Sequence, residues 1–164
     1  MASELSRSEL RVEKQRANAV LTLSSGESTC GCFFTGGGSA RHAGPERVGD
    51  VLNSEPEFFP FEIHDTEGIR TVLFNRRHVV MAVLTDNEAS DDPGYGVATR
   101  RVVSVRLSSG QRLRGAVRVY LPEGRDRLSD WARQPETFQY LETADATLII
   151  NMTHVLDVHE VSEP

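Results

Sequence analysis

Two short stretches decide the fold of this chain: Val20-Leu-Thr-Leu-Ser-Ser-Gly26 and Ser104-Val-Arg-Leu-Ser-Ser-Gly110. Both end in the same Leu-Ser-Ser-Gly turn. Further identities follow in the same order: Gly31 with Gly115, Arg47 with Arg127, Asp50 with Asp130, Phe58 with Phe138, Glu62 with Glu142, Asp65 with Asp145, Asn75 with Asn151, His78 with His154, and Val79 with Val155. Identities that keep one order over copies of about 60 residues predict a tandem duplication.

The repeat divides the chain into four segments. Residues 17–84 are the first copy and residues 101–164 the second. Between them, residues 85–100 are acidic, contain Pro and Gly and lack periodicity, which predicts a mobile linker. Residues 1–16 contain a Ser-x-x-Glu capping box, which predicts an N-terminal helix, with a polar tail as the alternative.

Each copy is predicted to be a small β-barrel. In the second copy, apolar residues alternate through 101–107 and 112–121 on either side of a Ser-Ser-Gly turn, which is typical of a β-hairpin. Three more strands are expected at 138–141, 146–150 and 154–161, and the first copy repeats the order at 18–24, 28–35, 57–63, 69–75 and 78–84. The predicted fold class is mainly β: two tandem five-stranded bent-sheet barrels, each with one short helix.

Two kinds of residue predict local backbone geometry. Gly115 lies on the inward face of the hairpin, which indicates a bend or a close approach of another backbone. Asp50 and Asp130 each follow an arginine by three residues. We interpret them as helix caps with a local ion pair, and a catalytic carboxylate is the alternative.

The charge is segregated along the chain. The formal net charge is −6, from 18 basic and 24 acidic residues. Residues 100–133 contain nine arginines and three acids, whereas residues 134–164 contain six acids and neither arginine nor lysine. We therefore expect these two segments to contact each other in the fold or in an assembly.

The composition and motifs exclude several classes of protein. No apolar run approaches the length of about 20 residues that a membrane helix needs. No basic segment followed by an apolar run occurs near the start, so we expect no secretory signal and a cytoplasmic location in a bacterium-like cell. Nucleophile-elbow, phosphate-loop, dinucleotide-binding and metalloprotease motifs are absent, so we expect neither enzymatic activity nor a cofactor.

An arginine stripe is the main candidate for partner binding. Arg106, Arg112, Arg114 and Arg118 occupy even-numbered positions of the predicted hairpin and therefore share one face. Such a stripe suits an acidic protein surface or a nucleic-acid backbone, and a solvated face balanced by the acidic C-terminal segment is the simpler alternative.

The repeated Asn-x-x-His motif is a second candidate. Asn75 and His78 in the first copy correspond to Asn151 and His154 in the second. They suit a pair of related ligand-binding or pH-sensing sites. Our preferred interpretation is that they close a turn through side-chain hydrogen bonds to the backbone.

The two cysteines give a weaker signal. Cys30 and Cys32 lie one residue apart on a predicted strand, where they cannot easily form a disulfide with each other. Together with His42 and His64 they could supply four metal ligands, but the spacing matches no known zinc motif. We interpret both as ordinary thiols and predict no metal site.

The second copy resembles the Sm-like small barrel. The residues that carry the resemblance are Val103-x-Val105-x-Leu107-x-x-Gly110-x-x-Leu113-x-Gly115-x-Val117 and Asn151-x-x-His154-Val155-x-x-Val158. The resemblance covers the first hairpin and the last strand pair, and it implies a five-stranded barrel of the Sm-like or SH3-like kind. At the RNA-binding loops of that family this chain has Leu121-Pro-Glu-Gly124 and Asn151-Met-Thr-His154, so RNA binding is not implied.

The second copy is also similar to an uncharacterised bacterial family of unknown function. A Gly-Arg-Leu-Ser-Asp type of helix start, a Phe-x-x-Leu strand and an Asn-x-x-His turn carry the similarity, at residues 124–130, 138–141 and 151–155. The similarity extends more weakly to the first copy. It implies no particular activity.

These observations predict a noncatalytic, cytoplasmic protein–protein interaction or assembly module built from two related β-barrels. Its partner is either a second copy of the chain or another protein, and no membrane is involved. The alternative is nucleic-acid binding, of RNA in particular, through the arginine face of the second copy.

Overall fold

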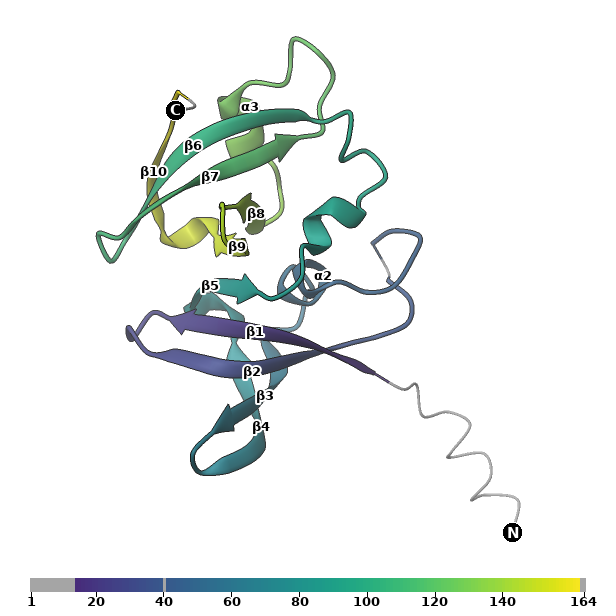
Figure 1. Cartoon of the computed structure of the whole chain (residues 1–164), viewed down its shortest axis with the longest axis vertical. Coiled ribbons are helices and arrows are strands. Elements are labelled where there is room, and N and C mark those ends of the chain that lie inside the picture. The colour runs from purple at the N-terminus through teal and green to yellow at the C-terminus, as the bar shows by residue number, and fades with distance from the viewer. Residues whose placement is uncertain (1–13, 40, 163–164) are drawn as a thin grey trace.

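The computed structural model describes residues 14–39 and 41–162. It is mainly β, as predicted: ten antiparallel strands form one sheet in the order β10-β6-β7-β8-β9-β5-β1-β2-β3-β4 (Figure 1). The strands are β1 (Gln15–Leu23), β2 (Ser28–Thr35), β3 (Phe58–Asp65), β4 (Gly68–Asn75), β5 (Val79–Leu84), β6 (Thr99–Leu107), β7 (Arg112–Val119), β8 (Phe138–Glu142), β9 (Thr147–Asn151) and β10 (Val155–Glu160).

The prediction of two five-stranded barrels is wrong. The ten strands form one open sheet, because β5 of the first half pairs with β9 of the second. Within each half the strands follow the same spatial order, β5-β1-β2-β3-β4 in one and β10-β6-β7-β8-β9 in the other. Strands β5 and β9, which were expected at the edges of two separate barrels, pair with each other and join the halves.

The predicted N-terminal helix falls mostly outside the described residues. Gln15 and Arg16, at the end of the predicted segment 1–16, belong to strand β1. Residues 1–13 lie outside the described part of the chain.

The repeated Leu-Ser-Ser-Gly turn has the same hydrogen bonds in both halves. Gly26 and Gly110 have φ angles of 91° and 90°, a conformation that glycine adopts without steric cost. The amide of Ser24 donates to the carbonyl of His78, and the amide of Ser108 donates to that of His154, each over 2.8 Å. Each turn is therefore held against the Asn-x-x-His segment of its own half.

Two short helices lie in corresponding places. They are α2 (Val48–Leu52) and α3 (Leu128–Ala132), and their N-cap amides donate to the carboxylates of Asp50 and Asp130 over 2.8 and 3.1 Å. The capping role predicted for both aspartates is confirmed. Asp50 forms an ion pair with Arg41 and a hydrogen bond with His42, and no ion pair with the preceding Arg47 is seen among the described residues.

The linker between the halves makes specific contacts in the folded chain. It contains a short 3-10 helix, η2 (Glu88–Asp91), and the Glu88 carboxylate accepts hydrogen bonds from the Val48 and Gly49 amides at the start of α2. The hydroxyl of Tyr95 donates to Glu142 over 2.5 Å. The predicted mobile linker is therefore tied to both halves.

Two glycines allow the backbones of paired neighbouring strands to approach each other closely. A Cβ atom at Gly31 would lie 1.8 Å from the Glu62 carbonyl oxygen, and one at Gly115 would lie 2.5 Å from the carbonyl oxygen of Glu142. The close approach predicted at Gly115 is confirmed, and the first half has the same feature. No helix in the described ranges is long and apolar enough to cross a membrane.

We predict that Gly31→Ala lowers the unfolding free energy by about 1–3 kcal/mol, because the added methyl group has no space beside a neighbouring backbone. Urea unfolding followed by circular dichroism measures the change. Gly37→Ala is the matched control, since a Cβ there meets no atom within 4 Å. Equal unfolding midpoints for the two variants would contradict the close approach of the β2 and β3 backbones at Gly31.

Candidate functional site

The junction between the two halves is built on strand pairing. β5 and β9 run antiparallel, with Met81 opposite Ile150 and Leu84 opposite Thr147. In Figure 1 the two strands lie between the half that carries β1–β4 and the half that carries β6–β8. The junction therefore continues one sheet through both halves.

Each hydrophobic core takes side chains from both halves. Phe138 and Ile149 of the second half are buried in the core of the first half, together with residues of α2 and β5. In the opposite direction, Val80 and Met81 of β5 are buried in the core of the second half. The junction thus completes both cores.

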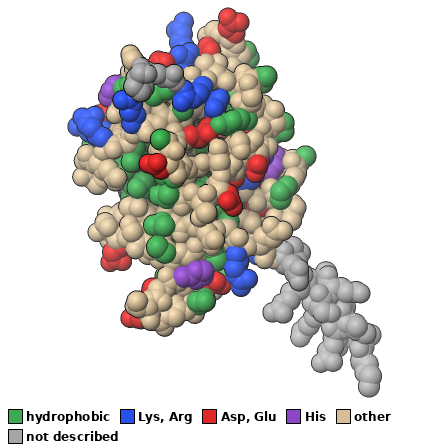
Figure 2. All heavy atoms as spheres, viewed as in Figure 1, with side chains coloured by type: hydrophobic (Ala, Val, Ile, Leu, Met, Phe, Trp, Pro, Cys, Tyr) green, Lys and Arg blue, Asp and Glu red, His purple; other side chains and the backbone are tan. Residues whose placement is uncertain are grey.

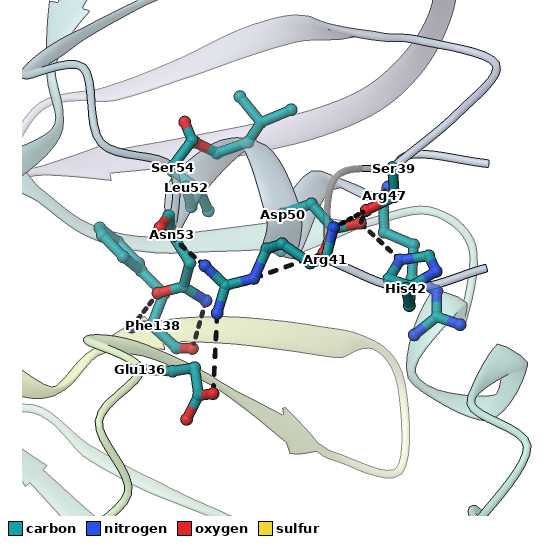
Figure 3. A network of polar contacts seen from close by, with 12 residues as sticks. Ser39, Arg41, His42, Arg47, Asp50, Leu52, Asn53, Ser54, Glu136 and Phe138 are labelled. Carbon is teal, nitrogen blue, oxygen red and sulfur yellow. Dashed lines mark hydrogen bonds and ion pairs between the residues drawn. The ribbon is translucent and has the colours of Figure 1, made fainter. Parts of the chain in front are cut away.

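Polar contacts fix the register of this junction. The Asn53 side chain, at the end of α2, donates to the Phe138 carbonyl over 3.0 Å and accepts from the Phe138 amide over 2.9 Å (Figure 3). Arg41 forms an ion pair with Glu136 at 3.6 Å. Tyr140 donates to Glu88, and burial raises the pKa of this tyrosine well above its usual range, so it stays protonated.

The second Asn-x-x-His motif also reaches across the junction. The side-chain Nδ2 of Asn151 donates to the Val79 carbonyl over 2.9 Å, and its side-chain Oδ1 accepts from the Thr153 backbone amide over 3.0 Å. His154 Nε2 lies 2.9 Å from the Arg77 carbonyl oxygen. The Asn side chain makes a hydrogen bond within the turn, as the preferred interpretation expects, and its contact across the halves was not foreseen.

The first Asn-x-x-His motif makes only the local contacts. The Asn75 oxygen accepts from the Arg77 amide over 3.0 Å, and His78 Nδ1 lies 2.9 Å from Ser24 Oγ. Within the described residues, Asn75 Nδ2 and His78 Nε2 have no hydrogen-bond partner. The structure therefore places the two motifs in different settings, one inside the junction and one at an open end.

The two ends of the sheet expose large apolar side chains. Strands β4 and β10 each pair with a single strand within the described part of the chain. Phe58 at the start of β3, Ile69 and Leu73 on β4, and Leu156 on β10 are all more than half exposed. Alternation predicted apolar strands here, but it could not tell which of them lie at an edge.

An apolar groove lies beside β10. It has a volume of about 390 Å³ and is lined mainly by Leu128, Ala132, Met152, Val155, Leu156 and Val158, from α3, η3 (Met152–His154) and β10. Its counterpart in the first half lies between α2 and β5, where Phe138 and Ile149 are buried. One groove is filled by the other half of the chain, and the other is open.

The arginine stripe is largely engaged within the chain. The Arg106 guanidinium forms an ion pair with the Asp157 carboxylate at 2.6 Å. Arg114 donates a hydrogen bond to the Ser162 carbonyl over 2.6 Å. The Arg118 guanidinium lies 3.3 Å from the Glu142 carboxylate and over the ring of Tyr95. Arg112 is exposed. In the view of Figure 2 the basic side chains gather over the second half. The expected contact between the basic and acidic segments is confirmed.

Among the described residues, Cys32, Glu62 and His64 lie close enough together to offer ligands to a metal ion, and they include two of the four residues considered above, Cys32 and His64. Cys32 Sγ lies 3.8 Å from Glu62 Oε1 and 4.0 Å from His64 Nε2. Cys30 is exposed and His42 binds Asp50, so these two do not join the cluster.

The charge of Arg16 and the protonation of the Cys32 thiol oppose a metal ion in this cluster, whereas the ionised Glu62 carboxylate does not. The Arg16 guanidinium lies 3.3 Å from Glu62, where it repels a cation. The hydrogen bond with His64 lowers the pKa of Glu62, while burial and the Glu62 charge raise the pKa of the Cys32 thiol. A metal needs the thiolate. We interpret the cluster as a hydrogen-bonded trio.

A larger cavity, of about 630 Å³, lies beside the junction and contains Arg41 and Arg76. Arginines in a cavity could bind an anion, but two of these guanidinium groups already donate to backbone carbonyls of the chain. Arg76 donates to the carbonyls of Val51 and Pro56, and Arg41 to that of Asn53. These guanidinium groups hold the end of α2 in place.

Comparisons with protein-family models, curated proteins and solved structures gave no match to this chain.

We predict that Asn151→Ala lowers the unfolding free energy by about 1–3 kcal/mol, because it leaves the Val79 carbonyl at the junction without its donor. The matched control is Asn75→Ala, which removes a turn hydrogen bond but no contact across the junction, and we expect it to cost less. Chemical unfolding of dilute protein compares the two. Equal losses would show that the contact across the junction adds nothing.

Proposed function

We propose that this chain is a noncatalytic, cytoplasmic assembly module, made of two copies of one structural unit, which binds protein partners through the ends of its sheet. One observation carries the proposal. Apolar side chains that are buried where the two halves meet have counterparts that are exposed at the two ends. An end with this chemistry is suited to another strand and its apolar side chains.

The character of terminal strand β4 supports this proposal. β4 has eight residues and exposes Ile69 and Leu73. Proteins usually protect such edges with short strands, proline or charge, because open backbone groups pair with other chains. On β4 the only charged side chain is Arg70, which is occupied by Asp65 at 3.0 Å. The edge is left open to pairing.

The settings of the polar residues support a noncatalytic role. Asp50 and Asp130 cap helices, His154 holds the junction, and His42 binds Asp50. Each of these contacts stabilises the fold. A catalytic acid or base needs instead to reach a substrate in a cavity.

RNA binding is the alternative function, and the structure gives it less support. Three of the four stripe arginines are already in contact with groups of the same chain. Binding a phosphate backbone would first break these contacts, and the free energy lost would offset the gain from counterion release.

We therefore predict that the protein does not retard single-stranded RNA in a native gel at low salt. Retardation that falls steeply with added salt, and that is lost in Arg112→Ala/Arg114→Ala, would favour the alternative. Gly37→Ala serves as the unrelated variant that should leave any RNA binding unchanged.

Photo-crosslinking in cells tests the proposed function. We predict that a benzophenone-bearing phenylalanine at Phe58 forms covalent adducts with protein, because this exposed side chain lies at the β4 end. The same residue at Tyr120, which is about as exposed but directly follows β7, an interior strand of the sheet, is the matched control. Adducts at Phe58 and not at Tyr120, whatever the partner, support the module. Absence of adducts at Phe58 would reject it.

A further inference from the structure

We propose that the partner at these ends is a second copy of this chain, joined head to tail: β10 of one copy pairs antiparallel with β4 of the next. This inference rests on the proposed function and names its partner. The template is the junction between β5 and β9 within the chain, whose chemistry is repeated at the two open ends.

Corresponding positions on the β3–β4 side show the first half of the match. Phe138 and Phe58 begin equivalent strands, and each lies opposite the Asn of its motif. Phe138 is 3% exposed inside the junction, whereas Phe58 is 52% exposed. Two residues before the Asn, Ile149 is fully buried and Leu73 is 65% exposed. The first half therefore presents, unburied, the side chains that the second half inserts into the junction.

The β10 side supplies the matching surface. In both halves the register shifts two residues after the His, leaving Val80 and Leu156 as the extra residues of a bulge. Val80 is 6% exposed, buried in the core of the other half, and Leu156 is 58% exposed. Beside Leu156 lies the open groove of about 390 Å³ between α3 and β10. Phe58 and Leu73 of another copy would occupy it as Phe138 and Ile149 occupy its counterpart.

The polar groups of the two ends also correspond. Asn151 Nδ2 and His154 Nε2 contact the carbonyls of Val79 and Arg77 across the junction. The corresponding atoms of Asn75 and His78 would meet the carbonyls at the same positions of the next copy, Val155 and Thr153. These interactions would satisfy the two donor positions that lack a partner within the described residues.

The register of the proposed contact follows from the template. Ala82 lies opposite Ile149 in the junction, so Val158 would lie opposite Leu73 of the next copy. Leu84 lies opposite Thr147, so Glu160 would lie opposite Thr71. An interface between two different surfaces leaves one end of each copy free, so it continues until a ring closes or a filament forms.

Two blocked variants test the proposal. Leu73→Arg changes the β4 end, and Leu156→Arg changes the β10 end; both side chains are exposed, so neither change disturbs a core. Val97→Arg is the matched control, since Val97 is also exposed but lies outside both terminal strands. The mass of each protein in solution is measured by size-exclusion chromatography with light scattering, and its fold by circular dichroism.

We expect the wild type and Val97→Arg to be oligomers and each blocked variant to be a monomer. An equimolar mixture of the two blocked variants should form a complex of two chains and nothing larger, because only one intact β10 end and one intact β4 end are available. Failure of the mixture to pair would overturn the head-to-tail arrangement, as would an oligomer that both single variants leave unchanged.

The outcomes separate this inference from the function on which it rests. A wild type that is monomeric at every concentration, with adducts at Phe58 to another protein, rejects self-assembly and keeps the assembly module. A monomeric wild type without any adduct rejects both.

Discussion

The antiparallel pairing of β5 with β9 is the interaction on which the rest of the structure depends. It brings Phe138 and Ile149 into the core of the first half, and Val80 into that of the second. A small five-stranded unit buries little apolar surface, so the side chains that each half inserts into the core of the other add burial that neither half has alone. The contacts of Glu88 with both α2 and Tyr140 then hold the linker to the same junction.

The same constraint explains the open ends. A unit that presents one apolar surface on its β3–β4 side and a different one beside its last strand can satisfy both only by contact with a neighbour on each side. Two units in one chain satisfy one such contact internally and leave one surface of each kind exposed. Exposed Leu73 and Leu156 are then expected consequences of the architecture, and their burial needs a partner.

Much of the local structure could be predicted from sequence, because local rules act on short segments. Alternation of apolar residues located the strands, and the turn glycines placed the hairpins. Gly115 indicated a close approach of another backbone, which the structure confirms. The error lay in how the strands close. Strands β5 and β9 are apolar on both faces, which indicates burial on both sides rather than a barrel strand with one solvent face. Edge pairing itself joins backbone groups, which every residue carries, so this signal does not name the partner strand.

The structure of the assembled protein, determined by crystallography or electron cryo-microscopy, tests the central claim most directly. The account predicts that β10 of one copy continues the sheet onto β4 of the next, with Val158 opposite Leu73 and Phe58 inside the groove between α3 and β10. Symmetric pairing of β4 with β4, or terminal strands that both face solvent in the assembly, would contradict it.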